Sequence, residues 1–309
     1  DARKLLGESQ ILRGEFDSAL QTFDEALSGP VPMLGRVALL TLKMEMWVSQ
    51  GRIDAALSTL IDILSAFGIA IDADKISTLA ASASDDIVRA RGRRTLQEVV
   101  QGEEATDPAV IALLDVLARA ADTAYMSGRD WSVATAALGI TTVLEHGVTV
   151  AAAMVFSNYA VADGEPTTPE GFARRAEYGR IGSAIADRYG IAAWIARANV
   201  ANPPHFDRSF VEAVARFDLA AATGWESSAL TWAAYAEVRS LFTMLVAGVP
   251  LGHLHTERQQ RVARIRRARR SVSEVCCDAL ELFVRELRTP TGDGSGWSPD
   301  GHTGPVTPA

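Results

Sequence analysis

The chain has 309 residues, of which 48% are hydrophobic and 22% charged, and its formal net charge at pH 7 is −8. Such a composition is typical of a globular protein with a substantial core, and the negative charge argues against general affinity for nucleic acid. The two cysteines, Cys276 and Cys277, are adjacent, so they indicate neither a disulfide framework nor a metal knuckle.

Two similar stretches near the N-terminus predict a repeated helical hairpin. The sequence GEFDSALQTFDEAL occupies residues 14–27, and GRIDAALSTLIDIL follows it by 37 residues, at 51–64. In each copy the apolar residues recur at i, i+3, i+4, i+7 and i+11, which places them on one face of an α-helix. A period of about 37 residues holds two helices and two turns. We therefore expect two helical hairpins over residues 1–67.

The middle of the chain, residues 68–255, is predicted to continue as a degenerate α-helical repeat region. Segments with the alternating pattern of β-strands are missing from it. Asp107 followed by Pro108, and Thr168 followed by Pro169, are typical of a helix N-cap and its first residue. The fold class predicted for the whole chain is all-α.

The C-terminal part is predicted as one long basic amphipathic helix over residues 256–288 and a disordered Gly/Pro tail over 289–309. Residues 258–270 contain seven arginines and no acid. These arginines form either an ordinary solvated face or a docking strip for an acidic partner or domain; a nucleic-acid contact is the weakest alternative. The candidate partner surface consists of Arg261, Arg264, Arg267 and Arg270.

Motifs that carry chemistry are missing from the sequence. It contains no phosphate-binding P-loop, no kinase catalytic-loop motif, no H-E-x-x-H and no G-x-S-x-G. We therefore expect no catalytic residue, no cofactor and no metal site, and the chain is not predicted to be an enzyme.

Isolated polar residues have simpler explanations. His253 and His255 diverge on a helix, so they do not share a metal ion without a loop and a third ligand. His146 is predicted to interact with a helix C-terminus. Asp85 and Asp86 lack the further carboxylate of a magnesium site and are predicted to lie on a solvated face or at a cap.

Four tryptophans are the large aromatic side chains of the middle of the chain. They are Trp131, Trp194, Trp225 and Trp232. Aromatic residues at helical spacing are usually core, and the alternative is a groove for a ligand or peptide.

The predicted location is the cytoplasm, with no membrane and no nucleic acid among the partners. The longest stretch without a charge, residues 147–162, is shorter than the roughly 20 apolar residues of a membrane helix. No secretory signal pattern opens the chain. Because the sequence begins at Asp1, we expect it to be a piece of a longer protein or a processed form.

Several short blocks, in order, resemble a family. They are GEFDSALQTF, QGRIDAAL with LSAFGI, TDPAVIALLDVLARAADTAY, LEHGVTVAAAMVFSNY and RAEYGRIGSAIADRYG. Together they span roughly residues 1–255 and are similar to the degenerate tetratricopeptide-like region that follows the AAA-type ATPase module of large bacterial signalling proteins. Those proteins often begin with a serine/threonine kinase domain and frequently end with a GAF domain and a sensor histidine kinase.

The resemblance implies a right-handed superhelix of tetratricopeptide-like hairpins with an interaction and regulatory role. It carries no catalytic residue over to this chain, and it implies protein partners or neighbouring ATPase and kinase domains of the same polypeptide. The alternative is a stand-alone all-α ligand-binding regulator or adaptor, with a pocket near Trp194, Trp225 and Trp232.

Overall fold

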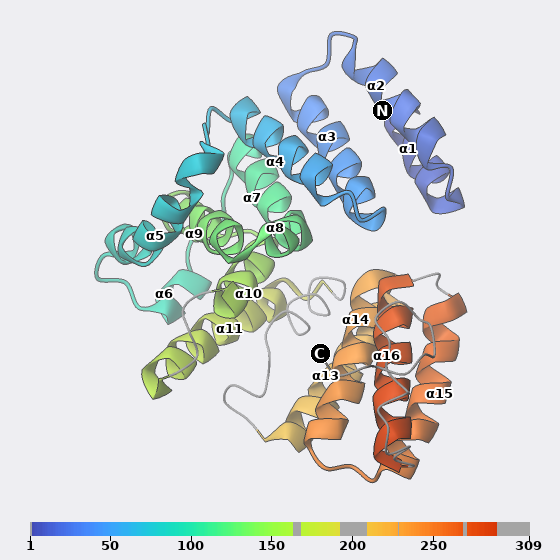
Figure 1. Cartoon of the computed structure of the whole chain (residues 1–309). Coiled ribbons are helices and arrows are strands. Elements are labelled where there is room, and N and C mark those ends of the chain that lie inside the picture. Colours follow the sequence, from blue (N-terminus) through green and yellow to red (C-terminus); the bar gives the residue numbers. More distant parts are fainter. Residues whose placement is uncertain (1, 163–167, 192–208, 228, 268–270, 289–309) are drawn as a thin grey trace. The chain divides into compact units, whose positions relative to one another are not determined.

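The computed structural model describes residues 2–162, 168–191, 209–227, 229–267 and 271–288 (Figure 1). The regular structure in these ranges is helical, with one isolated parallel bridge between Glu104 and Val148, so the predicted all-α class is confirmed. None of the described helices is both long enough and apolar enough to cross a membrane. The chain divides into unit 1 (Asp1–Tyr189) and unit 2 (Gly190–Ala309).

Unit 1 begins with two helical hairpins. They are α1 (Ala2–Arg13) with α2 (Phe16–Leu27), and α3 (Met33–Ser49) with α4 (Ile53–Ala66). The two sequence copies form α2 and α4, as predicted. Corresponding positions on their inner faces are fully buried: Ala19 and Phe23 in α2, and Ala56 and Leu60 in α4. The hairpins turn alike, because Gly14 and Gly51 have positive φ angles of 79° and 71°.

In the rest of unit 1, the outer helices pack around two buried ones, α9 (Arg129–His146) and α10 (Ala152–Ala162). The other elements are the 3-10 helix η1 (Ala73–Lys75), α5 (Ile76–Arg91), α6 (Leu96–Val100), α7 (Pro108–Arg119), α8 (Ala121–Ser127) and α11 (Pro169–Tyr189). Most residues of α9 and α10 are buried. Helices α5, α7, α8 and α11 pack around them, so these two helices form the centre of the unit.

The predicted helix starts are confirmed. The Asp107 carboxylate accepts a hydrogen bond of 2.8 Å from the backbone N–H of Ala109, and Pro108 is the first residue of α7. The Thr168 hydroxyl accepts one of 3.1 Å from the N–H of Gly171, and α11 begins at Pro169. A cap of this kind satisfies a backbone donor that has no partner inside the helix.

The boundary between the units lies inside the segment 68–255, which the sequence predicted as one region. Side chains at the end of α11 return to unit 1. Arg188 donates to the carbonyl of Val100 at 2.6 Å, and the Tyr189 hydroxyl donates to the carbonyl of Val148 at 3.0 Å. These contacts hold the end of α11 to unit 1, and no periodicity of the sequence reports them.

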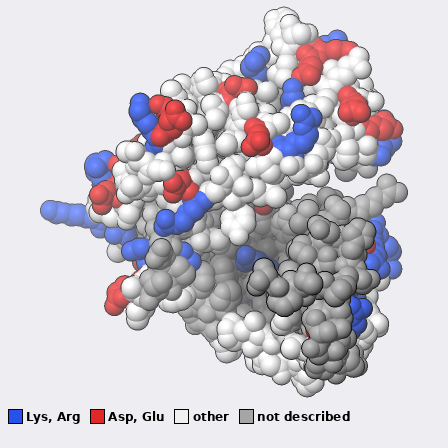
Figure 2. Space-filling model, viewed as in Figure 1, with Lys and Arg blue, Asp and Glu red and all other residues white. Residues whose placement is uncertain are grey.

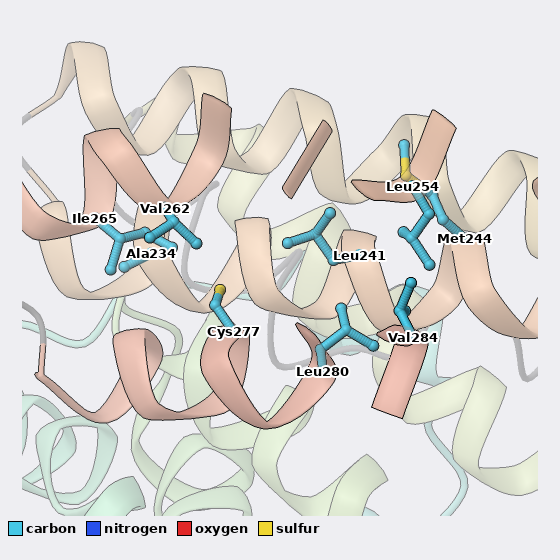
Figure 3. Packing of buried hydrophobic residues seen from close by; sticks show 9 residues of the cluster. All are labelled: Ala234, Leu241, Met244, Leu254, Val262, Ile265, Cys277, Leu280 and Val284. Atoms are coloured by element: carbon cyan, nitrogen blue, oxygen red, sulfur yellow. The ribbon is translucent and has the colours of Figure 1, made fainter. Parts of the chain in front are cut away.

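Unit 2 contains two further hairpins. They are α13 (Phe210–Glu226) with α14 (Leu230–Val246), and α15 (Leu251–Arg267) with α16 (Ser271–Arg288). Figure 3 shows side chains of α14, α15 and α16 pointing toward one another. The buried cluster comprises Ala234, Leu241, Met244, Leu254, Val262, Ile265, Cys277, Leu280 and Val284. This shared core joins α15 and α16 to α14.

The single long helix predicted over residues 256–288 is wrong. His255 contacts Glu281 at 3.1 Å and Arg266 contacts Glu274 at 2.6 Å, so α15 and α16 run antiparallel. Reversal of the chain lets both helices cover the same face of α14, which one continuous helix cannot do. The predicted tail over 289–309 lies outside the described residues.

Gly147 lies beside the bridge between Glu104 and Val148, against the backbone of Glu103 and Ala105. A side chain added at this position therefore probes how closely the two segments pack. The φ of Gly147 is 106°, and an added Cβ would lie 2.8 Å from the backbone N of Ala105 and the O of Glu103. Gly128 has a similar backbone, with φ 120°, but no atom within 4 Å of that position. Both Gly→Ala changes therefore strain the backbone by about 1–3 kcal/mol, and only Gly147→Ala adds a clash.

We expect Gly147→Ala to lower the free energy of unfolding of unit 1 by about 1–3 kcal/mol more than Gly128→Ala does. Chemical denaturation of the two variants beside the unmodified chain measures this difference. Equal losses in both variants would show that the bridge can separate without cost.

Candidate functional site

The arginine run of α15 faces acidic side chains of unit 2. Each of its first four arginines is paired: Arg258 with Asp278 and Glu281, Arg261 with Asp218, Glu237 and Glu257, Arg264 with Glu237, and Arg266 with Glu274 and Asp278. These pairs join α15 to α13, α14 and α16. The run therefore fastens the hairpins of unit 2 together.

Glu237 of α14 is the centre of this network, and its side chain is 2% exposed. One carboxylate oxygen accepts hydrogen bonds from Trp225 Nε1 at 3.1 Å and from Arg264 Nε and Nη2 at 2.9 and 2.6 Å. The other accepts one from Arg261 Nη1 at 3.0 Å. A buried carboxylate is tolerated only when it is paired and hydrogen-bonded in this way.

Arg261 bridges three helices from a position that is 5% exposed. Its Nη1 donates to Asp218 Oδ1 at 2.6 Å, an oxygen that also accepts from the Ser240 hydroxyl at 2.6 Å, and its Nη2 donates to Glu257 at 3.1 Å. Burial alone would lower the pKa of Arg261. The hydrogen bond and charge of Asp218, with the charge of Glu237, outweigh burial and raise that pKa, so the guanidinium stays charged.

The predicted partner surface is corrected at Arg261, which is part of the interior of unit 2. Arg264 keeps 43% of its side chain exposed, but its guanidinium is bonded to Glu237. Arg267 is exposed, and Arg270 lies outside the described residues. Arg261 is buried because it lies four residues before Ile265, on the apolar face of α15.

Sequence reasoning missed Glu237, although a signal for it was present. Glu237 lies on the same face of α14 as Ala233, Leu241 and Met244, which are all buried. A single acid on the apolar face of a helix needs a cationic partner inside the protein. The arginine-rich segment was the candidate source of that partner.

Of the four candidate tryptophans, Trp225 and Trp232 pack against the same small buried cluster, which consists of Ala220, Ala221 and Ala236. Trp131 is 7% exposed in the core of unit 1. In unit 2, Trp225 donates to Glu237, and Trp232 meets the edge of Tyr235 at a centroid distance of 5.8 Å. Trp194 lies outside the described residues.

No group of three His, Cys, Asp or Glu side chains within the described ranges could hold a metal ion. His255 bonds to Glu281 at 3.1 Å and to Gln259 at 3.0 Å, whereas His253 is exposed. Asp86 pairs with Arg89 at 2.7 Å. Each of these polar residues has a structural partner or faces solvent.

Comparison with known proteins gives no relative: no family model matches the chain, nor does any curated protein or solved structure. Function therefore has to be argued from the chain itself. The Glu237 carboxylate is 2% exposed and already accepts hydrogen bonds from Trp225, Arg261 and Arg264, so it is not presented to a substrate. Its arrangement suits a structural role, in which it holds α15 against α13 and α14.

Removal of the Glu237 carboxylate should destabilise unit 2 strongly. Glu237→Ala leaves Arg261 without one of its acids and Arg264 without its acid, and breaking a buried pair in this way costs about 3–5 kcal/mol. Hydrogen exchange of α14 and α15 peptides, followed in denaturant, measures the loss within unit 2.

Glu226→Ala is the matched control, because Glu226 is an exposed acid at the end of α13. It should change stability by no more than about 0.5 kcal/mol. If Glu237→Ala lowers the stability of unit 2 as little as this control does, the carboxylate does not hold the helices of unit 2 together.

Cys277 supplies a second test. Its thiol is completely buried, and burial raises its pKa to about 11, so it stays protonated at neutral pH. Its neighbour Cys276 is partly exposed. Since the thiolate is the reactive form, an alkylating reagent at pH 8 should modify Cys276 in the folded chain and Cys277 only after unfolding. Mass spectrometry of the labelled peptides distinguishes the two; prompt labelling of Cys277 would mean that α16 detaches readily.

Proposed function

We propose that the chain is a non-catalytic helical-repeat scaffold, the regulatory interaction segment of a bacterial signal-transduction ATPase or kinase. The observation that carries this proposal is the repeated pair of hairpins at the N-terminus. Their helices have the same 37-residue spacing, the same glycine turns and corresponding buried positions. Such repeats bury their apolar faces against neighbouring repeats and offer an extended surface to partners.

The form proposed for the stack is a right-handed superhelix of tetratricopeptide-like hairpins. Packing of α3 against both helices of the preceding hairpin supports it, since a repeat stack is built from contacts between neighbours. In a signalling protein this stack would carry nucleotide state or partner binding from one domain to the next by shifting against a neighbouring domain.

The charged side chains support an interaction role better than a catalytic one. The buried Glu237 carboxylate of unit 2 is engaged by Arg261 and Arg264 and is not presented at the surface. Figure 2 shows acidic and basic side chains side by side over the N-terminal helices of unit 1. This mixed surface favours protein partners over a nucleic acid, which selects a continuous basic field.

The genomic DNA on both sides of the coding segment gives the first test. An in-frame phosphate-binding loop and kinase motif upstream would support the proposal. A start codon next to Asp1 with a stop codon after Ala309 would contradict it and favour an independent adaptor.

A binding experiment then tests the regulatory part. We expect the purified chain to associate with the upstream ATPase module and the affinity to change between its ATP and ADP states. Absence of association in every nucleotide state would rule out this role.

A further inference from the structure

The outer face of α1 exposes two adjacent leucines. Leu5 is 65% exposed and Leu6 is 48% exposed, whereas the other side of α1 meets α2. There Gly7 lies against the ring of Phe23, and Arg3 donates to the carbonyl of Glu25. The leucines therefore lie on a part of α1 that its own hairpin does not cover.

The 37-residue repeat shows which contacts the corresponding face of α3 makes in the next hairpin. The position in α3 that corresponds to Leu6 is Lys43, and its Nζ lies 2.6 Å from Asp24 Oδ1 on α2. The Lys43 side chain is only 21% exposed. The same register pairs Gly7 with Met44, and both are buried. In α3, the face that corresponds to Leu6 is thus an interface with the preceding hairpin.

The same register indicates which chemistry fits against Leu6. Asp24 of α2 corresponds to Ile61 of α4, which is half-buried. A hairpin of the α3/α4 type would therefore place an isoleucine opposite Leu6, where the internal interface has Asp24 opposite Lys43. An apolar pair replaces an ion pair at the same place in the stack.

We propose that the outer face of α1 is the docking surface for a further helical hairpin of the same repeat, with an aliphatic residue at the Asp24 position of its second helix. A second copy of this chain does not provide that hairpin, because its α4 already packs against α8. The proposal rests on the scaffold function above and names the kind of partner that its first helix accepts.

An extended chain tests the proposal directly. A copy of residues 31–64, followed by a copy of residues 28–37, is joined to Asp1, which keeps the 37-residue register. If the added hairpin docks, hydrogen exchange of α1 should slow by at least about tenfold relative to the original chain, because two exposed leucines become buried. Unchanged exchange in α1 would overturn the proposal.

Substitutions separate docking from a general effect of the extension. Leu5→Ser with Leu6→Ser should abolish the added protection in the extended chain and leave the original chain nearly unchanged. Leu79→Ser is the matched control, since Leu79 is a 42% exposed leucine on α5, and it should preserve the added protection.

A charge swap tests the register itself. Leu6→Lys, combined with Asp at the copied Ile61 position, recreates the Asp24–Lys43 pair and should restore protection that either change alone removes. If instead the original chain sediments as a dimer that Leu5→Ser with Leu6→Ser dissociates, the face binds a second copy and the proposal is wrong. Failure of the docking experiment or of the oligomer experiment would reject this docking surface only. The proposed scaffold function is tested separately, by the flanking DNA.

Discussion

Several helices of this chain, above all α3, α9 and α10, have more apolar surface than one neighbouring helix can cover. Much of the structure follows from that constraint. In α3 the buried side chains surround the helix, so α2, α4, α7 and α8 all pack against it. In the centre of unit 1, α9 and α10 are buried on nearly every side. Because burial of apolar surface is the main favourable contribution to folding, each hairpin is stable only with the next one in place.

Unit 2 meets the same constraint with charge in addition to apolar burial. Helix α15 buries Arg261 together with Leu254, Val262 and Ile265. Glu237 of α14, whose side chain is 2% exposed, accepts hydrogen bonds from two arginines of α15. Removing one partner of such a buried pair is strongly destabilising, because an uncompensated charge is left in the interior.

The functional consequence is that two arginines of the basic segment, Arg258 and Arg261, are withdrawn from partners, because their side chains are only 13% and 6% exposed. The guanidinium groups of this segment are engaged by acids of the same unit from Arg258 to Arg266. An acidic partner could reach Arg261 only by displacing Asp218 and Glu237 from it, whereas the paired side chains of Arg264 and Arg266 remain 43% and 55% exposed. Recognition through apolar helix faces, such as the one that carries Leu5 and Leu6, has no such barrier.

Local patterns predicted local structure well. The 3.6-residue periodicity identified α2 and α4 with their buried faces, and the Asp107 and Thr168 caps marked two helix starts. Contacts between distant segments could not be predicted in this way. The reversal between α15 and α16 depends on which residues meet across the hairpin, and the arginine strip was taken for surface because Glu237 lies in another helix.

The same limit applies to the division into two units. The end of α11 is held to unit 1 by Arg188 and Tyr189, whose side chains donate to carbonyl groups that lie many residues earlier in the chain. Periodicity carries no information about such pairs, because it describes only which residues share a face.

Hydrogen exchange of the chain extended at Asp1 by the copied hairpin would test most directly which surface of this chain engages a neighbouring repeat. Apolar docking predicts that α1 gains protection around Leu5 and Leu6, relative to the isolated chain, while α15 is unchanged. New protection along the arginines of α15, with none in α1, would contradict it.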